Sequence, residues 1–300
     1  IGCRADESTG DLHGYMQDVR CYKGVGKYTQ NFLVPVAGMD GPSCVPDSPA
    51  GVSLGSVLTV ASTGGSSWIN GNSDQISVPY TADAFDWTSS STDFCVESWN
   101  LHTALVSGGS GVWAHGTGGG FQAKLDVIQH SGYPGYCWNF EMLSAVRIRS
   151  DVPVTLNKWT HVACVMRSGT GYLYVDGVQQ AITGGHDIGA ADTFYIGRQV
   201  HTSGQYRWNG LISNFRVVTG SAVYTGNFTP PTAPLENITN TKLLCLKDHR
   251  SVTSYEVSTG ALTASGNGLE AVSSSPFESD VSLQPTKYPT LNPLSATQSR

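Results

Sequence analysis

Charge is scarce in this sequence: Asp, Glu, Lys and Arg make up 13% of its 300 residues, against about 25% in an ordinary soluble domain. The Lys and Arg residues form no cluster, and the formal net charge is -6. Because contacts to phosphate need a basic surface, we expect no nucleic-acid partner. The sequence also has no apolar run near the roughly 20 residues of a membrane-spanning helix, so we expect no membrane insertion.

Cysteine pairs spaced as CxxC are also absent, which argues against a zinc site. The seven cysteines are Cys3, Cys21, Cys44, Cys95, Cys137, Cys164 and Cys245. An odd number leaves at least one unpaired, and Cys95 and Cys164 lie in apolar, strand-like runs. We therefore expect buried thiols and folding in a reducing cytoplasm.

Signals for nucleophilic or phosphate-binding sites are missing too. The eight histidines are scattered, and no Gly-x-Ser-x-Gly turn precedes a helix. The glycine-rich stretch GTGGGF at 116–121 is followed by no helix, so it indicates a turn rather than a phosphate cradle. No long segment shows the helical period, which argues against helix bundles.

What the sequence does contain is typical of β structure. Short β-rich runs separated by turn residues predict the strands of an all-β sandwich. These runs span residues 76–79, 93–100, 120–127, 137–142, 159–167, 171–176, 194–197 and 208–218. Asp176-Gly177 predicts a two-residue hairpin turn, because both central positions favour positive φ.

One stretch of the chain occurs twice. Residues 14–35 and 210–231 align without a gap and are identical at eight of 22 positions. The pairs are Gly14/Gly210, Arg20/Arg216, Gly24/Gly220, Tyr28/Tyr224, Thr29/Thr225, Asn31/Asn227, Phe32/Phe228 and Pro35/Pro231. We expect Gly220 to permit a turn, Arg216 to bond carbonyls or an acidic neighbour, and Tyr224 and Phe228 to fasten a terminal segment to its sheet. The repeat then maintains a fold rather than a ligand site.

Two groups of stretches resemble known proteins. STDFCVESW (91–99), NKWTHVACVMRSGTGYLYVDGV (157–178) and FYIGRQ with WNGLISNFRVVTGSAVYTGNFTPPTAPL (194–235) resemble the laminin-G-like, concanavalin A-like lectin/glucanase sandwich family. VPDSPAGV (45–52), the same closing block, and TKLLCLKDHR with SSSPF (241–277) resemble tandem repeats in virion structural proteins of tailed phages, especially marine ones. The resemblance implies an antiparallel β-sandwich, or jelly roll, with partial repeats at both ends.

On this basis the chain divides into five segments. Residues 1–35 are expected to be the C-terminal strands of a truncated preceding laminin-G-like repeat, and residues 36–57 a linker rich in Pro, Gly and Ser. A complete sandwich domain is expected over 58–235, an inter-repeat β segment over 236–277, and an extended tail over 278–300. If 1–35 lacks its own domain body, its strand edge should be covered by the second domain, another copy of the chain or an upstream segment.

Related glucanases place two catalytic carboxylates on one strand in an arrangement such as Glu-x-Asp-x-Glu. Glu97 and Glu141 lie in strand-like runs without that pattern, so we expect no enzyme. Glu97 is expected to pair with a neighbouring cation or to be solvated at a sheet edge, and His161 to be structural. A second carboxylate about 5–10 Å from Glu97 or Glu141, across a cleft, would instead indicate a glycoside hydrolase.

Members of the resembled family often hold Ca²⁺ at a loop rim, and INGNSDQ supplies Asn70, Asn72 and Asp74 at alternate positions. The same residue types also form local turn hydrogen bonds, so both interpretations stay open. We expect no other cofactor.

Sugar binding by such sandwiches uses exposed aromatic rings with a few polar groups beside them. The candidate residues are His130, Tyr133, Tyr136 and Trp138 in QHSGYPGYCWNF, with Trp113 and His115 in GVWAHGTGG. Trp113 and Trp138 could instead fill the core. Tyr133 and Tyr136 flank Pro134-Gly135 and are expected on an exposed loop, whereas Trp208 is expected to be structural.

The function expected from these features is that of a non-enzymatic virion surface protein, a fibre, decoration or adhesin whose loops recognise host glycans. The alternative is a purely architectural particle or assembly protein without a sugar ligand, and a third hypothesis is a glycoside hydrolase. The expected partners are other virion subunits or copies of the chain, and host cell-surface polysaccharide. The expected location is the virion, after folding in the host cytoplasm.

Overall fold

The computed structural model describes residues 64–277, with gaps at 106–107, 119, 134, 144–145, 181–184 and 201–205. The segments expected over 1–35, 36–57 and 278–300, including the first copy of the repeat, lie outside the described residues. Among the residues that are described, no helix is long and apolar enough to cross a membrane.

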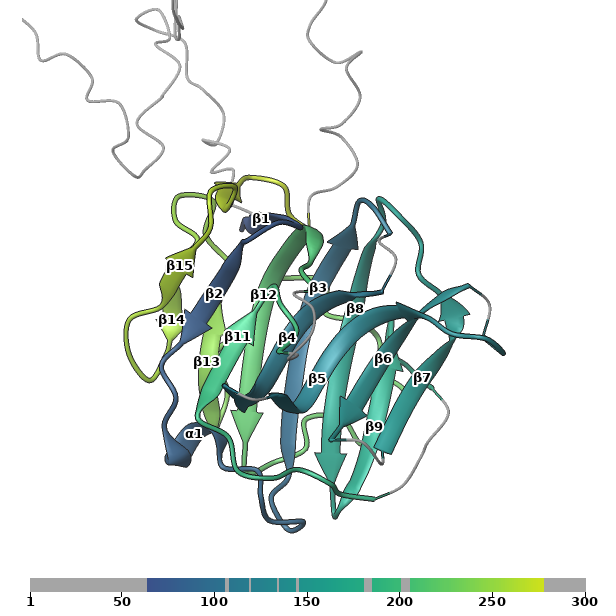
Figure 1. Cartoon of the computed structure of the whole chain (residues 1–300). Coiled ribbons are helices and arrows are strands. Elements are labelled where there is room, and N and C mark those ends of the chain that lie inside the picture. The colour runs from purple at the N-terminus through teal and green to yellow at the C-terminus, as the bar shows by residue number, and fades with distance from the viewer. Residues whose placement is uncertain are drawn as a thin grey trace, which may run out of the picture. The chain divides into compact units, whose positions relative to one another are not determined.

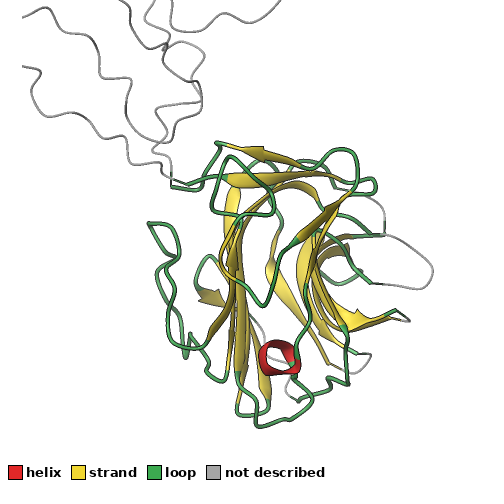
Figure 2. Ribbon diagram, turned by 90° about the vertical axis from the view of Figure 1, so that its left-hand side faces the viewer, coloured by secondary structure: helices red, strands yellow, loops and turns green. Residues whose placement is uncertain are grey.

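Two antiparallel sheets form a sandwich, as the sequence predicts (Figure 1). The nine-stranded sheet has the order β10-β9-β8-β3-β12-β1-β16, with β13 beside β12 and β14 beside β13. The seven-stranded sheet has the order β15-β2-β11-β4-β5-β6-β7. Figure 2 shows the two layers from the side, with the short helix α1 (Ala82–Phe85) at one end of the space between them.

The nine-stranded sheet contains β1 (Ser66–Asn70), β3 (Phe94–His102), β8 (Trp159–Arg167), β9 (Thr170–Val175), β10 (Val178–Gln179), β12 (Asn209–Thr219), β13 (Thr241–Cys245), β14 (Tyr255–Val257) and β16 (Glu270–Val272). The seven-stranded sheet contains β2 (Gln75–Val78), β4 (Ser110–Thr117), β5 (Gly120–Gln129), β6 (Tyr136–Met142), β7 (Val146–Pro153), β11 (Thr193–Ile196) and β15 (Thr263–Ser265). Each predicted run overlaps one of these strands.

The hairpin predicted at Asp176-Gly177 is confirmed. It joins β9 to β10, with φ of 47° at Asp176 and 75° at Gly177. A Cβ on Gly177 would collide with the carbonyl oxygen of Phe228, so the turn lies directly against a later segment of the chain. Glycine is therefore required at this position both by φ and by space.

The core lies between the sheets because alternate strand residues point inward. In β3, Phe94 and Val96 face the main core, whereas Cys95 belongs to a smaller cluster on the other face of the sheet. The described cysteines, Cys95, Cys137, Cys164 and Cys245, are all buried and free, as predicted. Burial raises the pKa of the Cys95 and Cys164 thiols well above the ordinary value.

The segment predicted as an inter-repeat β region, 236–277, does form strands, and these strands join the sandwich. β13 pairs with β12, β15 with β2, and β16 with β1. They therefore cover backbone edges of β2 and β1 that would otherwise stay unpaired.

Candidate functional site

The turn between β5 and β6 carries the aromatic residues predicted for sugar binding. His130 and Tyr133 are half-buried and meet edge to face, 5.6 Å between ring centroids. Gly132 and Gly135, with φ of 94° and 77°, permit the tight turn. Arg149, from the neighbouring strand β7, places its guanidinium 5.6 Å from the Tyr133 ring centroid. Tyr133 therefore lies beside a cation at the rim of the seven-stranded sheet.

The other predicted sugar-binding residues are distributed differently. Tyr136, at the start of β6, is partly buried against the main core. Trp113 and Trp138 are 0% and 2% exposed, and Trp113 stacks on Phe194 with 5.8 Å between centroids. Sugar contact is therefore wrong for both tryptophans, and the core-filling alternative is confirmed. Trp208, 0% exposed, is structural as expected.

The prediction that His115 contacts sugar is also wrong. Its ring is buried and stacks on Trp87, 4.6 Å between centroids, and its Nε2 lies 2.8 Å from the carbonyl oxygen of Phe85. Burial lowers the pKa of His115 to about 4. This histidine is a neutral residue of the core, held by its stacking on Trp87 and its contact with the Phe85 carbonyl.

The predicted calcium residues form a local turn. Asp74 is fully buried; its Oδ2 accepts a hydrogen bond from the Asn70 amide at 3.1 Å and its Oδ1 from the Gly268 amide at 3.0 Å. Asn70 Oδ1 accepts from the Asn72 amide at 2.9 Å. Within the described residues no group of three His, Cys, Asp or Glu side chains could hold a metal ion. The contacts among Asn70, Asn72 and Asp74 correspond to the local-turn interpretation, and the second oxygen of Asp74 binds the backbone of a distant segment at Gly268.

A cluster of charged side chains lies on the outer face of the seven-stranded sheet, where β5, β6 and β7 pair with one another. Lys124 Nζ is 2.6 Å from Asp126 and 3.1 Å from Glu141. Asn139 Nδ2 donates to Asp126 at 2.8 Å and to Glu141 at 3.2 Å, and Arg147 Nε donates to Glu141 at 2.7 Å. Sequence reasoning missed this cluster, although its members alternate with apolar residues in QAKLDV and NFEMLS.

Asp126 and Glu141 are a close carboxylate pair, because oxygens of both bind the same ammonium. Burial alone would raise the pKa of Glu141, but the charge of Lys124 and the hydrogen bond from Arg147 hold it below the usual value. A glycosidase acid needs the opposite, a raised pKa. The pair is therefore a charge-balanced ion network, with Lys124 bound between the two groups.

Two buried side-chain atoms beside this network, Asn139 Oδ1 and Arg149 Nε, have no hydrogen-bond partner among the residues that the structure describes. Asn139 and Arg149 are direct cross-strand partners between β6 and β7. The side chain of Arg149 makes no hydrogen bond or ion pair within the described part of the chain; its partner is the ring of Tyr133.

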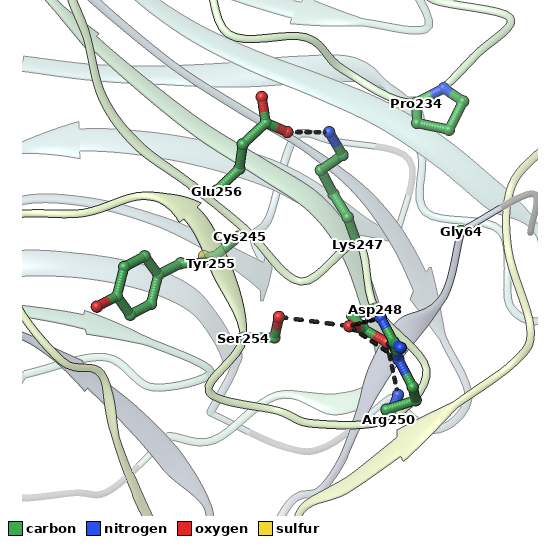
Figure 3. Close-up of a pocket in the computed structure, with 9 residues that line it drawn as sticks. All are labelled: Gly64, Pro234, Cys245, Lys247, Asp248, Arg250, Ser254, Tyr255 and Glu256. Carbon is green, nitrogen blue, oxygen red and sulfur yellow. Dashed lines mark hydrogen bonds and ion pairs between the residues drawn. The ribbon is translucent and has the colours of Figure 1, made fainter. Parts of the chain in front are cut away.

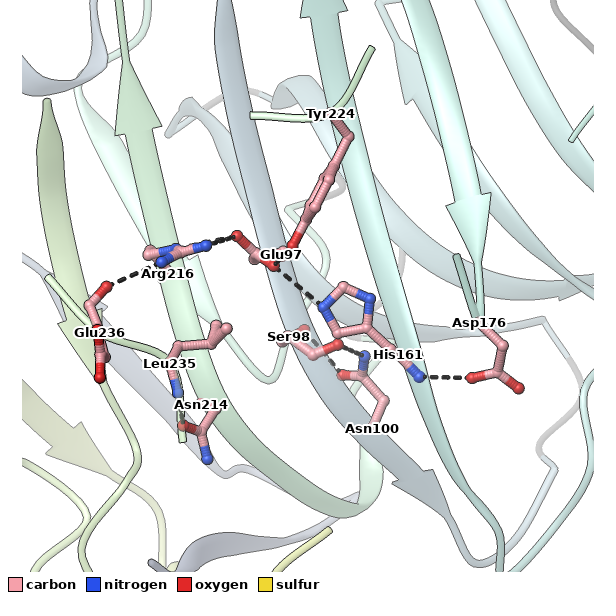
Figure 4. A network of polar contacts seen from close by, with 10 residues as sticks. All are labelled: Glu97, Ser98, Asn100, His161, Asp176, Asn214, Arg216, Tyr224, Leu235 and Glu236. Carbon is pink, nitrogen blue, oxygen red and sulfur yellow. Dashed lines mark hydrogen bonds and ion pairs between the residues drawn. The ribbon is translucent and has the colours of Figure 1, made fainter. Parts of the chain in front are cut away.

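On the opposite side of the molecule, Glu97 lies at the centre of a closed network on the outer face of the nine-stranded sheet (Figure 4). Its Oε1 accepts from Arg216 Nε at 2.9 Å, and its Oε2 from Tyr224 Oη at 2.7 Å. His161 Nε2 lies 3.0 Å from Oε2. The predicted pairing with a neighbouring cation is confirmed, and Glu97 is fully buried.

Two of the repeated residues, Arg216 and Tyr224, belong to this network. We call the segment 220–236, which follows β12 and crosses this face, the strap. The rings of Tyr224 and Phe228 stack at 3.6 Å between centroids, Asn227 Oδ1 accepts from the Gln179 amide at 2.9 Å, and Gly220 has a φ of 100°. The prediction that the repeat maintains the fold is confirmed for this second copy.

Sequence reasoning did not find the following two pockets, which lie in the described part of the chain. One, of about 410 Å³, lies between Pro234 and the β13–β14 region (Figure 3); its Lys247 pairs with Glu256 at 2.7 Å and its Arg250 with Asp248 at 2.9 Å. The other, of about 420 Å³, is lined by Trp99, Phe277 and the prolines at 230, 231 and 276. The cations lining the first pocket are thus bound to carboxylates of the same pocket.

Solved structures with a similar fold are distant. A pentraxin from Limulus polyphemus is 16% identical, with a TM-score of 0.41, over 55% of this chain and 80% of that one. A carbohydrate-binding protein from Bacteroides ovatus, described as putative, is 21% identical, with a TM-score of 0.48, over 69% of this chain and 60% of that one. Domain 4 of a GH43 arabinanase from Geobacillus stearothermophilus, solved with arabinotriose, is 18% identical, with a TM-score of 0.39, over 53% of this chain and 72% of that one. No curated protein matches the chain.

A family model gives a firmer assignment. The model described as the concanavalin A-like lectin/glucanases superfamily matches residues 70–222, just over half of the 300 residues. The matched range includes β2 to β12 and thus most of both sheets. The chain belongs to the concanavalin A-like lectin/glucanase superfamily.

Proposed function

We propose that this protein is a non-enzymatic glycan-binding domain whose site lies on the outer face of the seven-stranded sheet, at the turn between β5 and β6. The observation that carries the proposal is the placement of Tyr133. Its half-buried ring lies against His130 on one strand connection and under the Arg149 guanidinium from β7. An aromatic ring flanked by hydrogen-bonding groups is the usual composition of a sugar site.

Polar groups on the same face of the sheet support the same proposal. A sugar hydroxyl both donates and accepts hydrogen bonds, and this face offers an unused acceptor, Asn139 Oδ1, and an unused donor, Arg149 Nε. The ion network behind them, from Lys124 to Arg147, holds Asn139 in place through its amide nitrogen. The site would therefore be preorganised, which lowers the entropic cost of binding.

Binding without catalysis is supported by the state of the carboxylates. Asp126 and Glu141 are joined by Lys124, and Glu97 is enclosed by Arg216, His161 and Tyr224. The pKa values of Glu97 and Glu141 are lowered by their cation and hydrogen-bond partners, whereas a general acid needs a raised pKa. A glycosidase would need at least one of them uncoupled from its cation.

We further propose that the domain is displayed on a phage particle as a fibre, decoration or adhesin, with other virion subunits or copies of the chain as neighbours. The support is the resemblance of the repeat and closing blocks to virion proteins, together with a repeat whose residues serve folding. A purely architectural role remains the second candidate, because a stacked array of such sandwiches needs no sugar ligand.

The test is retention of the labelled protein on candidate bacterial cells, with and without prior removal of surface polysaccharide. We expect sugar-dependent retention that Tyr133→Ala abolishes. Tyr255→Ala is the matched control, since Tyr255 is 45% exposed but lies at the pocket of Figure 3. Retention that survives polysaccharide removal, or no retention on any host, would favour the architectural role.

A further inference from the structure

We infer that the sugar bound at this face is carboxylated, with its carboxylate on the outer edge of the Arg149 guanidinium and a hydroxyl held between Arg149 Nε and Asn139 Oδ1. The inference rests on the proposed function and names the class of sugar that the same site takes.

Arg149 differs from the other cations of this face. Lys124 and Arg147 are bound to Asp126 and Glu141, so those four charges balance. Arg149 has no carboxylate partner within the described residues, although the protein as a whole has a formal net charge of -6. Because Glu141 is already bound by two cations, Arg149 remains the uncompensated positive charge of the site.

The amide of Asn139 is oriented by its neighbours. Its Nδ2 donates to Asp126 and Glu141, so its Oδ1 is turned away from both carboxylates. Asn139 is 0% exposed, and no donor from the described part of the chain reaches Oδ1. An unsatisfied buried acceptor costs free energy that a suitable ligand group would recover.

The two unsatisfied atoms together select a hydroxyl. Arg149 Nε can only donate and Asn139 Oδ1 can only accept, and their residues are direct cross-strand partners. A carboxylate could not serve Asn139, because it has no proton to donate. A hydroxyl can accept from Nε and donate to Oδ1 at the same time.

The rest of the guanidinium suits a carboxylate. Of the three guanidinium nitrogens of Arg149, Nε alone is fully buried without a partner, so Nη1 and Nη2 are at least partly accessible. The Tyr133 ring, 5.6 Å from the guanidinium carbon, restrains its plane. A planar fork of two N–H groups matches a carboxylate geometrically, and within the described residues no protein carboxylate competes for it.

The test is calorimetric titration of the full chain with polygalacturonate, alginate and polysialic acid, each beside its carboxyl-reduced form. We expect binding to at least one acidic polymer, at least about tenfold weaker after carboxyl reduction, and weakening as ionic strength rises. Arg149→Gln should abolish the preference for the acidic form. Arg149→Lys keeps the charge but loses the planar pair of guanidinium N–H donors, so it should weaken the preference for the acidic form about tenfold.

Arg167→Gln is the matched control, because Arg167 also lies over a tyrosine ring, 4.3 Å from that of Tyr172, but on the nine-stranded sheet. Equal binding of the acidic and reduced polymers, lost in Tyr133→Ala, would overturn this inference and leave the proposed function standing. Carboxylate-dependent binding that Arg149→Gln does not change would also overturn it. Absence of binding to every polymer in both forms would count against the inference and the proposed function together.

Discussion

Arg216 binds Glu97 through two guanidinium nitrogens, at 2.9 Å from Nε and 2.5 Å from Nη2, where the side chains are 6% and 0% exposed. The third guanidinium nitrogen of the same arginine, Nη1, donates to the carbonyl of Glu236 at 2.8 Å. The arginine therefore links the sheet to the end of the strap. Removing one member of such a buried pair leaves the other charge uncompensated.

We expect Glu97→Ala to destabilise the fold by about 3–5 kcal/mol, because it leaves Arg216 as an uncompensated charge in a buried site. Urea denaturation measures this loss. Lys242→Ala is the control, since Lys242 pairs with Asp83, whose side chain is 87% exposed, and such a pair is worth at most about 1 kcal/mol. Equal losses in the two variants would contradict a structural role for Glu97.

The free energy of unfolding should fall as the pH drops from about 6.5 towards 4, because two buried histidines bind protons only when the chain unfolds. Burial lowers the pKa of His102 and His115 from 6.5 to about 4. In this window the unfolded chain binds protons that the folded protein does not, so the free energy of unfolding rises with pH. Each histidine accounts for up to about 3 kcal/mol at the acid end of the window.

The measurement is urea denaturation at a series of pH values. We expect His102→Phe to reduce the slope of stability against pH by about half. Ile238→Thr, at an exposed position and without a titratable group, should leave the slope unchanged. A slope that stays the same in His102→Phe would show that this residue is not held neutral by the fold.

Gly177→Ala should destabilise the protein by about 2 kcal/mol or more, because an alanine at φ 75° is strained and its Cβ would collide with the Phe228 carbonyl. Thermal unfolding reports the loss. Gly226→Ala, where an added Cβ meets no atom within 4 Å, is the matched control and should stay within about 0.5 kcal/mol of the parent. Similar melting temperatures for both variants would contradict the packing of the hairpin under the strap.

A chain ending at residue 240 should aggregate, because it lacks β13, β15 and β16 and so exposes the edges of β12, β2 and β1. The truncation also removes Leu243, Leu244 and Cys245 from the interior. Light scattering of this variant against a chain ending at 277 tests the prediction. Equal monodispersity would show that the sandwich is complete without its last strands.

The sequence was informative where a local pattern matched the backbone. The strands with alternating or continuous β-rich residues were predictable, as was the Asp176-Gly177 turn, because its residue types suit positive φ. The repeat also pointed to Arg216, Tyr224 and Phe228, since residues kept in both copies are those that hold the strap. The strands β14, β15 and β16 are three residues each and leave almost no pattern to detect.

The candidate site was harder to predict, since it depends on pairing between strands. Aromatic content alone did not separate Tyr133, at the rim, from Trp113 and Trp138, in the core. Lys124 and Glu141 meet only because β5 and β6 pair in one register, with Lys124 opposite Glu141. Arg149 was not a candidate at all, because its significance lies in the missing partner, which only a structure can reveal.

The first and last described strands are neighbours: Ser66 of β1 pairs with Val272 of β16. A polypeptide that enters through β1 therefore leaves at the same corner through β16. In a tandem array of such domains, the linkers would form an almost continuous chain. Each domain would project to one side of it and add very little to the length of the array. A force applied to the two ends of the domain would act on β1 and β16 at the same end of the pair. The hydrogen bonds between these strands would then break one after another.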